Sequence, residues 1–138
     1  MPDLLYLLFA IEDPDIDMAP AIASLVRQLN EEREWGCGEI AFVNEIDEAS
    51  VTQPGDEPIW TLGGLLTLTR PTGDALSERT QLEDVEILVD RLCRFTKGGP
   101  AFVVDYDGEE IGSIADGRAD RSLRDGLLGE WRKRLQEQ

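Results

Sequence analysis

The side chains with the clearest chemical potential are four carboxylates that lie close together in the chain. Asp105, Asp107, Glu109 and Glu110 surround the dipeptide Asp107-Gly108, which is a strong signal for a two-residue β-hairpin turn. A pair of carboxylates can carry out acid–base chemistry, as in glycoside hydrolysis. A tight turn, however, places these groups in water rather than in the aromatic-lined cleft that such an enzyme needs. We therefore expect turn residues in contact with solvent or with a partner, and no catalysis.

A second acidic segment begins with Asp13, Asp15 and Asp17, whose alternating spacing matches the first positions of a calcium-binding loop. Met18 stands where that loop requires glycine, and Ser24 stands where it requires a bidentate glutamate. The segment therefore predicts a solvated acidic loop in front of a helix, and no metal site.

Residue types exclude most other catalytic and cofactor chemistry. The chain has no histidine, so catalytic triads of the usual kind are not expected. Cys37 and Cys93 are isolated and predict no zinc site, and the sequence leaves open whether they pair. Gly36 and Gly38 are not followed by the third glycine of a dinucleotide fingerprint, and no phosphate-binding loop of the form GxxxxGK[ST] occurs. We predict neither a cofactor nor an enzymatic activity.

Charge is the strongest compositional signal. The chain has 29 acidic and 13 basic residues, which gives a formal net charge of −16. Residues 1–69 contain only two of the basic residues, Arg27 and Arg33, whereas six lie between Arg118 and Arg134. Nucleic acid and anionic membranes repel such a protein, and basic proteins attract it. The charge is either a solubilising surface with a basic C-terminal helix or an acidic face for a partner.

A partner would have three acidic patches to use, in residues 12–17, 45–48 and 105–110. Trp35 and Tyr106 lie near the ends of predicted elements, where aromatic side chains either pack within the fold, which is the expectation we prefer, or anchor an interface. Arg118, Arg121 and Arg124 could instead neutralise the acids of the hairpin within the fold. The predicted partner-binding residues are Asp13, Asp15, Asp17, Trp35, Glu45, Asp47, Glu48, Asp105, Tyr106, Asp107, Glu109 and Glu110.

The sequence predicts short strands that alternate with helices, and these elements must position the side chains described above. The continuous apolar run Leu4–Ile11 predicts a central strand that is buried on both faces and includes Tyr6 in the core. Residues 39–46 and 59–69 predict two further strands, the second interrupted by Gly63-Gly64, where a bulge, a bend or a close backbone approach is expected. Residues 101–105 and 110–114 predict the hairpin.

Three helices are predicted between and after these strands. The first follows Asp17 and has an apolar stripe of Ile22, Leu25, Val26 and Leu29. The second begins at a capping box, Thr80 to Glu83, and ends near Gly98. The third spans about residues 120–135, with apolar residues every four positions and two weakening glycines. The apolar residues expected in the stripes of the last two helices are Leu82, Val85, Leu88, Val89, Leu92 and Phe95, then Leu123, Leu127, Trp131 and Leu135.

The predicted fold class is α+β, with residues 1–138 forming a single acidic domain. The expected element order is β-α-β-β-α-β-β-α, in which a single-layer mixed or antiparallel sheet of about five strands packs against three helices. We expect the hairpin of residues 101–114 to be the centre of the architecture. The apolar run of residues 4–11 is bounded by Asp3 and Glu12, lacks the features of a signal peptide and is too short to span a bilayer. A cytoplasmic location is expected.

Size, acidity and α+β composition together give a profile that resembles the bacterial immunity proteins, which neutralise nuclease or other toxins. The resemblance is one of profile and assigns no residues. It implies a small inhibitor that binds a basic toxin or effector and covers its active site by electrostatically steered association. Two alternatives are a mimic of nucleic acid charge that inhibits a DNA-binding protein, and an enzyme or small-molecule binder of another type.

Overall fold

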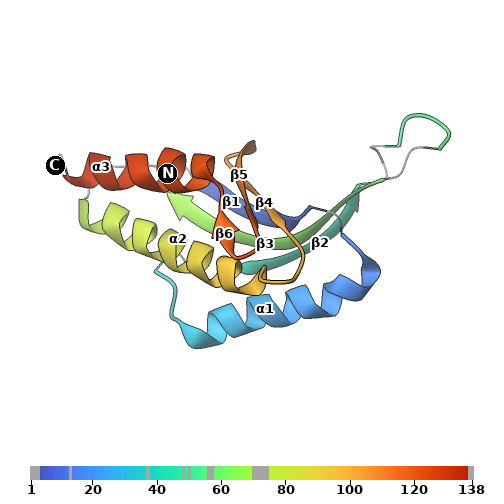
Figure 1. Cartoon of the computed structure of the whole chain (residues 1–138), viewed down its shortest axis with the longest axis horizontal. Coiled ribbons are helices and arrows are strands. Elements are labelled where there is room, and N and C mark those ends of the chain that lie inside the picture. Colours follow the sequence, from blue (N-terminus) through green and yellow to red (C-terminus); the bar gives the residue numbers. More distant parts are fainter. Residues whose placement is uncertain are drawn as a thin grey trace.

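The computed structural model of the chain describes residues 4–12, 14–36, 38–47, 49, 51–55, 58–69 and 75–136. Within these residues one antiparallel sheet has the strand order β2-β3-β1-β4-β5-β6 and carries helices on one side (Figure 1). The strands are β1 (Leu4–Ile11), β2 (Ala41–Asp47), β3 (Ile59–Thr69), β4 (Phe102–Tyr106), β5 (Glu109–Ala115) and β6 (Arg118–Ala119). The helical segments are the 3-10 turn η1 (Ile16–Met18), α1 (Ala19–Glu32), α2 (Ala75–Phe95), the π-helix η3 (Ser122–Gly129) and α3 (Glu130–Gln136). The predicted α+β class and the order of the main elements are confirmed.

The first strand, β1, is central because it pairs with β3 on one side and β4 on the other. Its side chains alternate, however: Leu5, Leu7, Phe9 and Ile11 are buried, whereas Tyr6 is 43% exposed. The prediction that this strand is buried on both faces, with Tyr6 in the core, is therefore wrong. The helices of the described residues lie on the same side of the sheet, so a central strand can still expose every second side chain.

Gly63 and Gly64 mark a close approach between β3 and β1. The register between the two strands is continuous at this point, with Phe9 opposite Gly64. A Cβ atom at Gly63 would overlap the backbone of Phe9, and one at Gly64 would overlap its ring. Of the three explanations expected from the sequence, close approach is the correct one, and the glycines create the space in which Phe9 is fully buried.

The hairpin of β4 and β5 has the predicted turn. Asp107 and Gly108 have φ values of 53° and 87°, the left-handed pair that a type I′ turn requires. A second Asp-Gly pair, Asp116-Gly117, repeats this geometry with φ values of 51° and 82° and leads into β6. The sequence prediction of about five strands missed this short sixth strand. The hairpin is also not the centre of the sheet, because β1 lies between it and β3.

The first two long helices bury the predicted stripes, although the start of α2 differs from the prediction. Ile22, Leu25, Val26 and Leu29 of α1 are buried, as is the expected stripe of α2, with Phe95 partly buried. Because α2 already begins at Ala75, Thr80 and Glu83 lie inside it, and the predicted capping box is wrong. No helix of the described residues is both long and apolar enough to cross a membrane.

Two side chains, one from α1 and one from the loop after it, hold the chain segment that links α1 to β2. Asn30 donates to the carbonyl of Ile40 at 3.0 Å and accepts from its N–H at 2.9 Å. Trp35 donates its indole N–H to the carbonyl of Leu29 at 2.9 Å and is only 6% exposed. Trp35 closes the core beside α1, and little of its side chain is accessible to a partner.

Candidate functional site

Among the described residues, no helix covers one side of the sheet, which we call the open face. In β1, β3, β4 and β5, residues that alternate with the buried positions point away from the core. The register with β3 extends this assignment to β2. The central strands of the open face carry apolar and hydroxyl side chains, and its outer strands carry acids. The open face consists of Tyr6, Leu8, Ala10, Ala41, Val43, Glu45, Asp47, Ile59, Thr61, Gly63, Leu65, Thr67, Val103, Asp105, Glu110 and Ser113.

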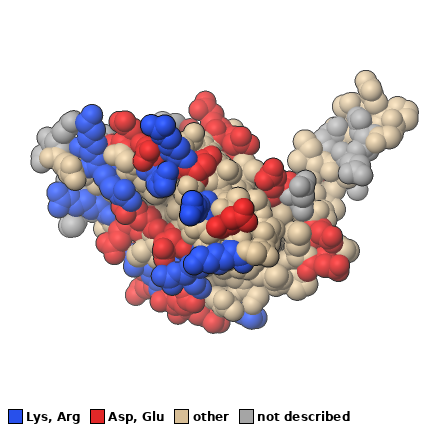
Figure 2. Space-filling view, viewed as in Figure 1, with Lys and Arg blue, Asp and Glu red and all other residues tan. Residues whose placement is uncertain are grey.

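The sheet and the helices differ in the charged residues that they carry. Strands β1 to β5 contain no lysine or arginine, and their five charged residues are all acidic. Figure 2 shows the helical side, where basic and acidic side chains alternate over the surface. The strand acids are Glu45, Asp47, Asp105, Glu109 and Glu110. The net negative charge therefore includes a set of carboxylates on the sheet with no basic neighbour on the same strands.

Ion pairs between described residues neutralise several acids of the helical side. Arg33 binds Asp84 at 2.8 Å, Arg91 binds Glu32 at 2.9 Å, and Arg132 binds Glu86 at 2.8 Å. Hydrogen bonds to these carboxylates raise the pKa of Arg33 and of Arg132. Further pairs, Arg94–Asp90 and Arg121–Asp125, lie within helical segments. Arg121 thus pairs with Asp125 and not with the hairpin acids that it was considered to neutralise.

Four acids of the sheet take part in none of the ion pairs between described residues: Glu45, Asp105, Glu109 and Glu110. Asp105 and Glu110 are direct cross-strand neighbours on the open face. Like charges placed opposite each other destabilise a sheet, by up to about 1 kcal/mol. The placement of these two carboxylates is therefore unfavourable for the sheet itself.

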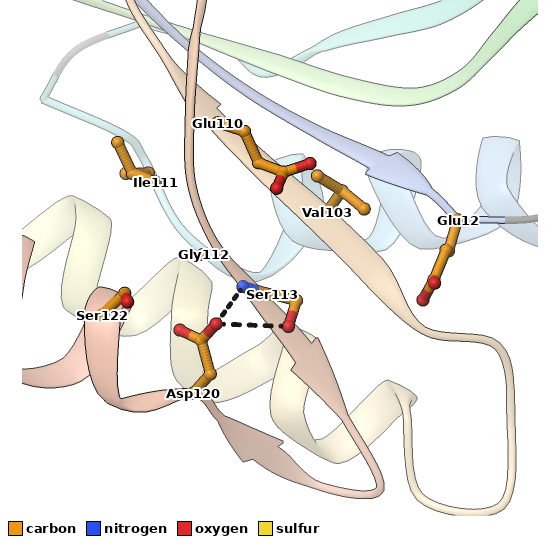
Figure 3. Close-up of a pocket in the computed structure, with 8 residues that line it drawn as sticks. All are labelled: Glu12, Val103, Glu110, Ile111, Gly112, Ser113, Asp120 and Ser122. Atoms are coloured by element: carbon orange, nitrogen blue, oxygen red, sulfur yellow. Dashed lines mark hydrogen bonds between the residues drawn. The ribbon is translucent and has the colours of Figure 1, made fainter.

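A cavity of about 320 Å³ opens beside this pair, at the end of the sheet formed by β4 and β5 (Figure 3). In the close-up, Val103 lies between the side chains of Glu12 and Glu110, and Asp120 closes the opposite side. Asp120 accepts hydrogen bonds from the N–H of Ser113 at 3.0 Å and that of Leu123 at 2.9 Å. These bonds commit Asp120 to holding η3 against β5, whereas Glu12 and Glu110 are exposed to solvent.

The structure brings only part of the predicted partner-binding set together. Glu45, Asp47, Asp105 and Glu110 lie on the open face, while Asp107 forms the hairpin turn beyond it. Elsewhere, Asp15 caps η1 by accepting from the N–H of Asp17 at 3.0 Å. These two acids therefore belong to a helix start and are not part of the open face. Asp13 and Glu48 lie outside the described residues.

The other aromatic candidate, Tyr106, points to the covered side. It pairs with Leu7, whose side chain is buried, and packs partly buried against the core, with Glu109 opposite it in β5. Tyr106 is therefore not an anchor on the open face. Sequence reasoning missed Tyr6, which has that position, because an unbroken apolar run hides the alternation of a one-sided sheet.

Comparison of the chain with protein families, curated proteins and solved structures finds no match. Among the described residues, no group of three or more metal-ligating side chains is arranged to hold a metal ion. What the open face offers chemically is attraction for positive charge, from Glu45, Asp105 and Glu110, next to apolar surface. Both are properties of a binding surface.

Proposed function

We propose that this protein is a small acidic inhibitor of the immunity type, which binds a basic toxin or effector and covers its active site. The observation that carries the proposal is a difference in pairing: Asp84, Glu32 and Glu86 of the helical side bind arginine, whereas Glu45, Asp105 and Glu110 of the open face take part in no ion pair between described residues. Carboxylates that a fold leaves unpaired are available to lysine and arginine side chains of another protein.

Electrostatics supports association with such a target more than it supports the fold. A net charge of −16 creates an attractive field for a basic protein and raises the association rate constant, which then falls as salt screens the field. Oppositely charged groups at the interface also orient the two proteins and reject acidic competitors. Occlusion of a basic active site requires only this binding, and no reactive group on the inhibitor.

The apolar strip between the acids favours this proposal over a mimic of nucleic acid charge. Leu8 and Leu65 are cross-strand neighbours at the middle of the open face, and Val103 lies close by on β4. A surface that imitates a phosphate backbone would carry negative charge along its length. An apolar centre instead suits one partner with a complementary surface.

The test compares two triple variants that each remove three negative charges. One is Glu45→Gln, Asp105→Asn, Glu110→Gln on the open face. The control is Glu31→Gln, Glu34→Gln, Glu130→Gln, whose members are exposed on or beside the helices. The tagged protein is first used to capture basic proteins from the native cells at low salt. Stopped-flow kinetics then measures its association with the purified partner. We expect the open-face variant to slow association about tenfold or more and to flatten its salt dependence, while the control has a smaller effect.

Two results would contradict the proposal. One is recovery of no basic protein at low salt, where electrostatic attraction is strongest. The other is an equal loss of association rate in both triple variants, which would mean that overall charge acts without a specific face. A partner that is inhibited in its own enzymatic assay by the unmodified chain, and less by the open-face variant, would establish the inhibitor role.

A further inference from the structure

We infer that the partner docks on the open face itself, with the apolar side chains of β1, β3 and β4 at the centre of the interface and the carboxylates at its rim. The inference rests on the proposed function, because it takes the partner to be a basic protein. It adds the surface that is covered, the arrangement of that surface and its central anchor, Tyr6.

The centre of the open face is unusually apolar for a surface without a covering layer. Leu8 of β1 lies opposite Leu65 of β3, and Ala10 of β1 lies opposite Val103 of β4. An antiparallel sheet with one uncovered face normally carries polar side chains there. The outward positions of β1 and β3 carry no charged side chain. A contiguous apolar surface of this kind marks an interaction site.

The acids flank this centre on both sides. The strand order places β2, with Glu45, beyond β3, and places β4 and β5, with Asp105 and Glu110, on the other side of β1. An apolar centre with a charged, solvated rim is the arrangement found in protein–protein interfaces. Because the rim is acidic, the complementary surface is an apolar patch surrounded by lysine and arginine.

A second copy of this chain does not fit the same surface. A symmetric dimer formed through the open face would bring the two copies of one rim together, so carboxylates would meet carboxylates. Each copy also carries a net charge of −16, so two copies repel each other over distances up to the Debye length. Charge complementarity therefore selects a basic partner rather than self-association.

Tyr6 has the properties of the central anchor. It stands on the middle strand of the described sheet and is 43% exposed, although its neighbours on the same face are only partly exposed. Tyrosine is among the residues that contribute most to interface affinity, since it buries a large ring and keeps a polar tip. Its backbone carbonyl accepts from the N–H of Asp107 at 2.9 Å, which ties this position to the hairpin turn.

The experiment places the photoreactive residue benzoyl-phenylalanine at Tyr6 and, in a separate protein, at Ile16. Ile16 is a matched control because it is apolar and 76% exposed but belongs to η1, away from the open face. Both chains are irradiated in the native cells, and mass spectrometry identifies the adducts. We expect the Tyr6 position to yield one adduct with a basic protein, and the Ile16 position to yield none.

The identified protein is then purified and titrated with three variants of the full chain. Tyr6→Ala is expected to raise the dissociation constant about thirtyfold, the effect of losing an interface hot spot. Tyr6→Phe keeps the ring and should change affinity less than about fivefold, and Ile16→Ala should leave it unchanged. Circular dichroism and urea unfolding of each variant separate loss of binding from loss of folding.

The outcomes distinguish the two proposals. A basic protein that crosslinks only from Ile16, or whose affinity Tyr6→Ala leaves unchanged in a folded variant, overturns the docking surface but keeps the proposed function. An adduct between two copies of this chain from the Tyr6 position overturns the inference in favour of a dimer. An adduct with an acidic or neutral protein from Tyr6 overturns both proposals.

Discussion

Asp84 is a buried carboxylate that forms an ion pair with Arg33. The side chain of Asp84 is fully buried, and Arg33 donates to its Oδ1 from Nε at 3.1 Å and from a terminal nitrogen at 2.8 Å. Arg33 also lies 5.5 Å from the ring centre of Trp35, in a cation–π arrangement. The pair therefore joins the loop after α1 to the middle of α2.

Replacing Arg33 by Gln should destabilise the protein by about 3 kcal/mol, the lower end of the range for breaking a buried ion pair, since Arg33 is itself 27% exposed. Urea unfolding at neutral pH measures the change. The hydrogen bond to Asp84 raises the pKa of Arg33, so the contribution of its protonated guanidinium is present at neutral pH and is lost as pH rises through that raised pKa.

Arg94→Gln is the matched control for this measurement. Arg94 pairs with Asp90 at 3.0 Å, but both side chains are more than half exposed, and such pairs contribute less than about 1 kcal/mol. Equal destabilisation by Arg33→Gln and Arg94→Gln would show that burial of Asp84 does not strengthen the pair.

At the scale of elements, η3 is the segment where sequence periodicity and structure differ most. Leucine and tryptophan recur every four residues from Leu123, which predicts a regular α-helix over about residues 120–135. The structure has a π-helix over Ser122–Gly129, and the buried positions are Leu123 and Leu128, with Leu127 only partly buried. The spacing of five between buried leucines follows the i to i+5 pattern of a π-helix.

Gly126→Ala tests how much a glycine weakens this segment. A Cβ at Gly126 has no other atom within 4 Å, so the substitution adds no overlap and reduces the entropy of the unfolded chain. We expect the free energy of unfolding to rise by about 0.4–1 kcal/mol, measured by urea unfolding.

Gly64→Ala provides the contrast within the same protein. Its Cβ would overlap the ring of Phe9, and overpacking of a core costs about 1–3 kcal/mol or more. If both alanine variants shift stability in the same direction, the distinction between open and occupied glycine positions is incorrect.

The whole molecule combines a helical side, on which several acids have arginine partners, with a sheet whose charged residues in β1 to β5 are all acidic. A net charge of −16 repels itself in the compact state, and the described ion pairs relieve this repulsion only around the helices. Raising NaCl from about 0.01 M to about 1 M shortens the screening length from about 30 Å to about 3 Å. The urea midpoint should therefore increase with salt.

The open-face triple variant supplies the control for this prediction. Without the charges of Glu45, Asp105 and Glu110, less repulsion remains to be screened, so its midpoint should rise less with salt than that of the unmodified chain. A midpoint that falls with salt would mean that the ion pairs of the helical side contribute more to stability than the repulsion costs.

Local sequence patterns alone determined most of the helices and strands and many of the core residues. The stripe from Ile22 to Leu29 is buried as its helical spacing predicts, and Asp107-Gly108 forms its turn because few other residue pairs accept two positive φ values. Asp116-Gly117 carries the same local signal and leads into the sixth strand. These features depend on neighbours in the chain, so the sequence suffices to find them.

Only the tertiary structure decided which surface could bind. Leu4–Ile11 has no polar residue to show which side faces the core, and that choice depends on where the helices pack. The same packing buries Trp35, turns Tyr106 inward and leaves Tyr6 exposed between acids from distant parts of the chain. The positions of the acids in the sequence predicted which carboxylates could bind a partner. Whether an acid forms an ion pair within the fold depends on arginines far away in the sequence, as Arg33 beside Asp84 shows.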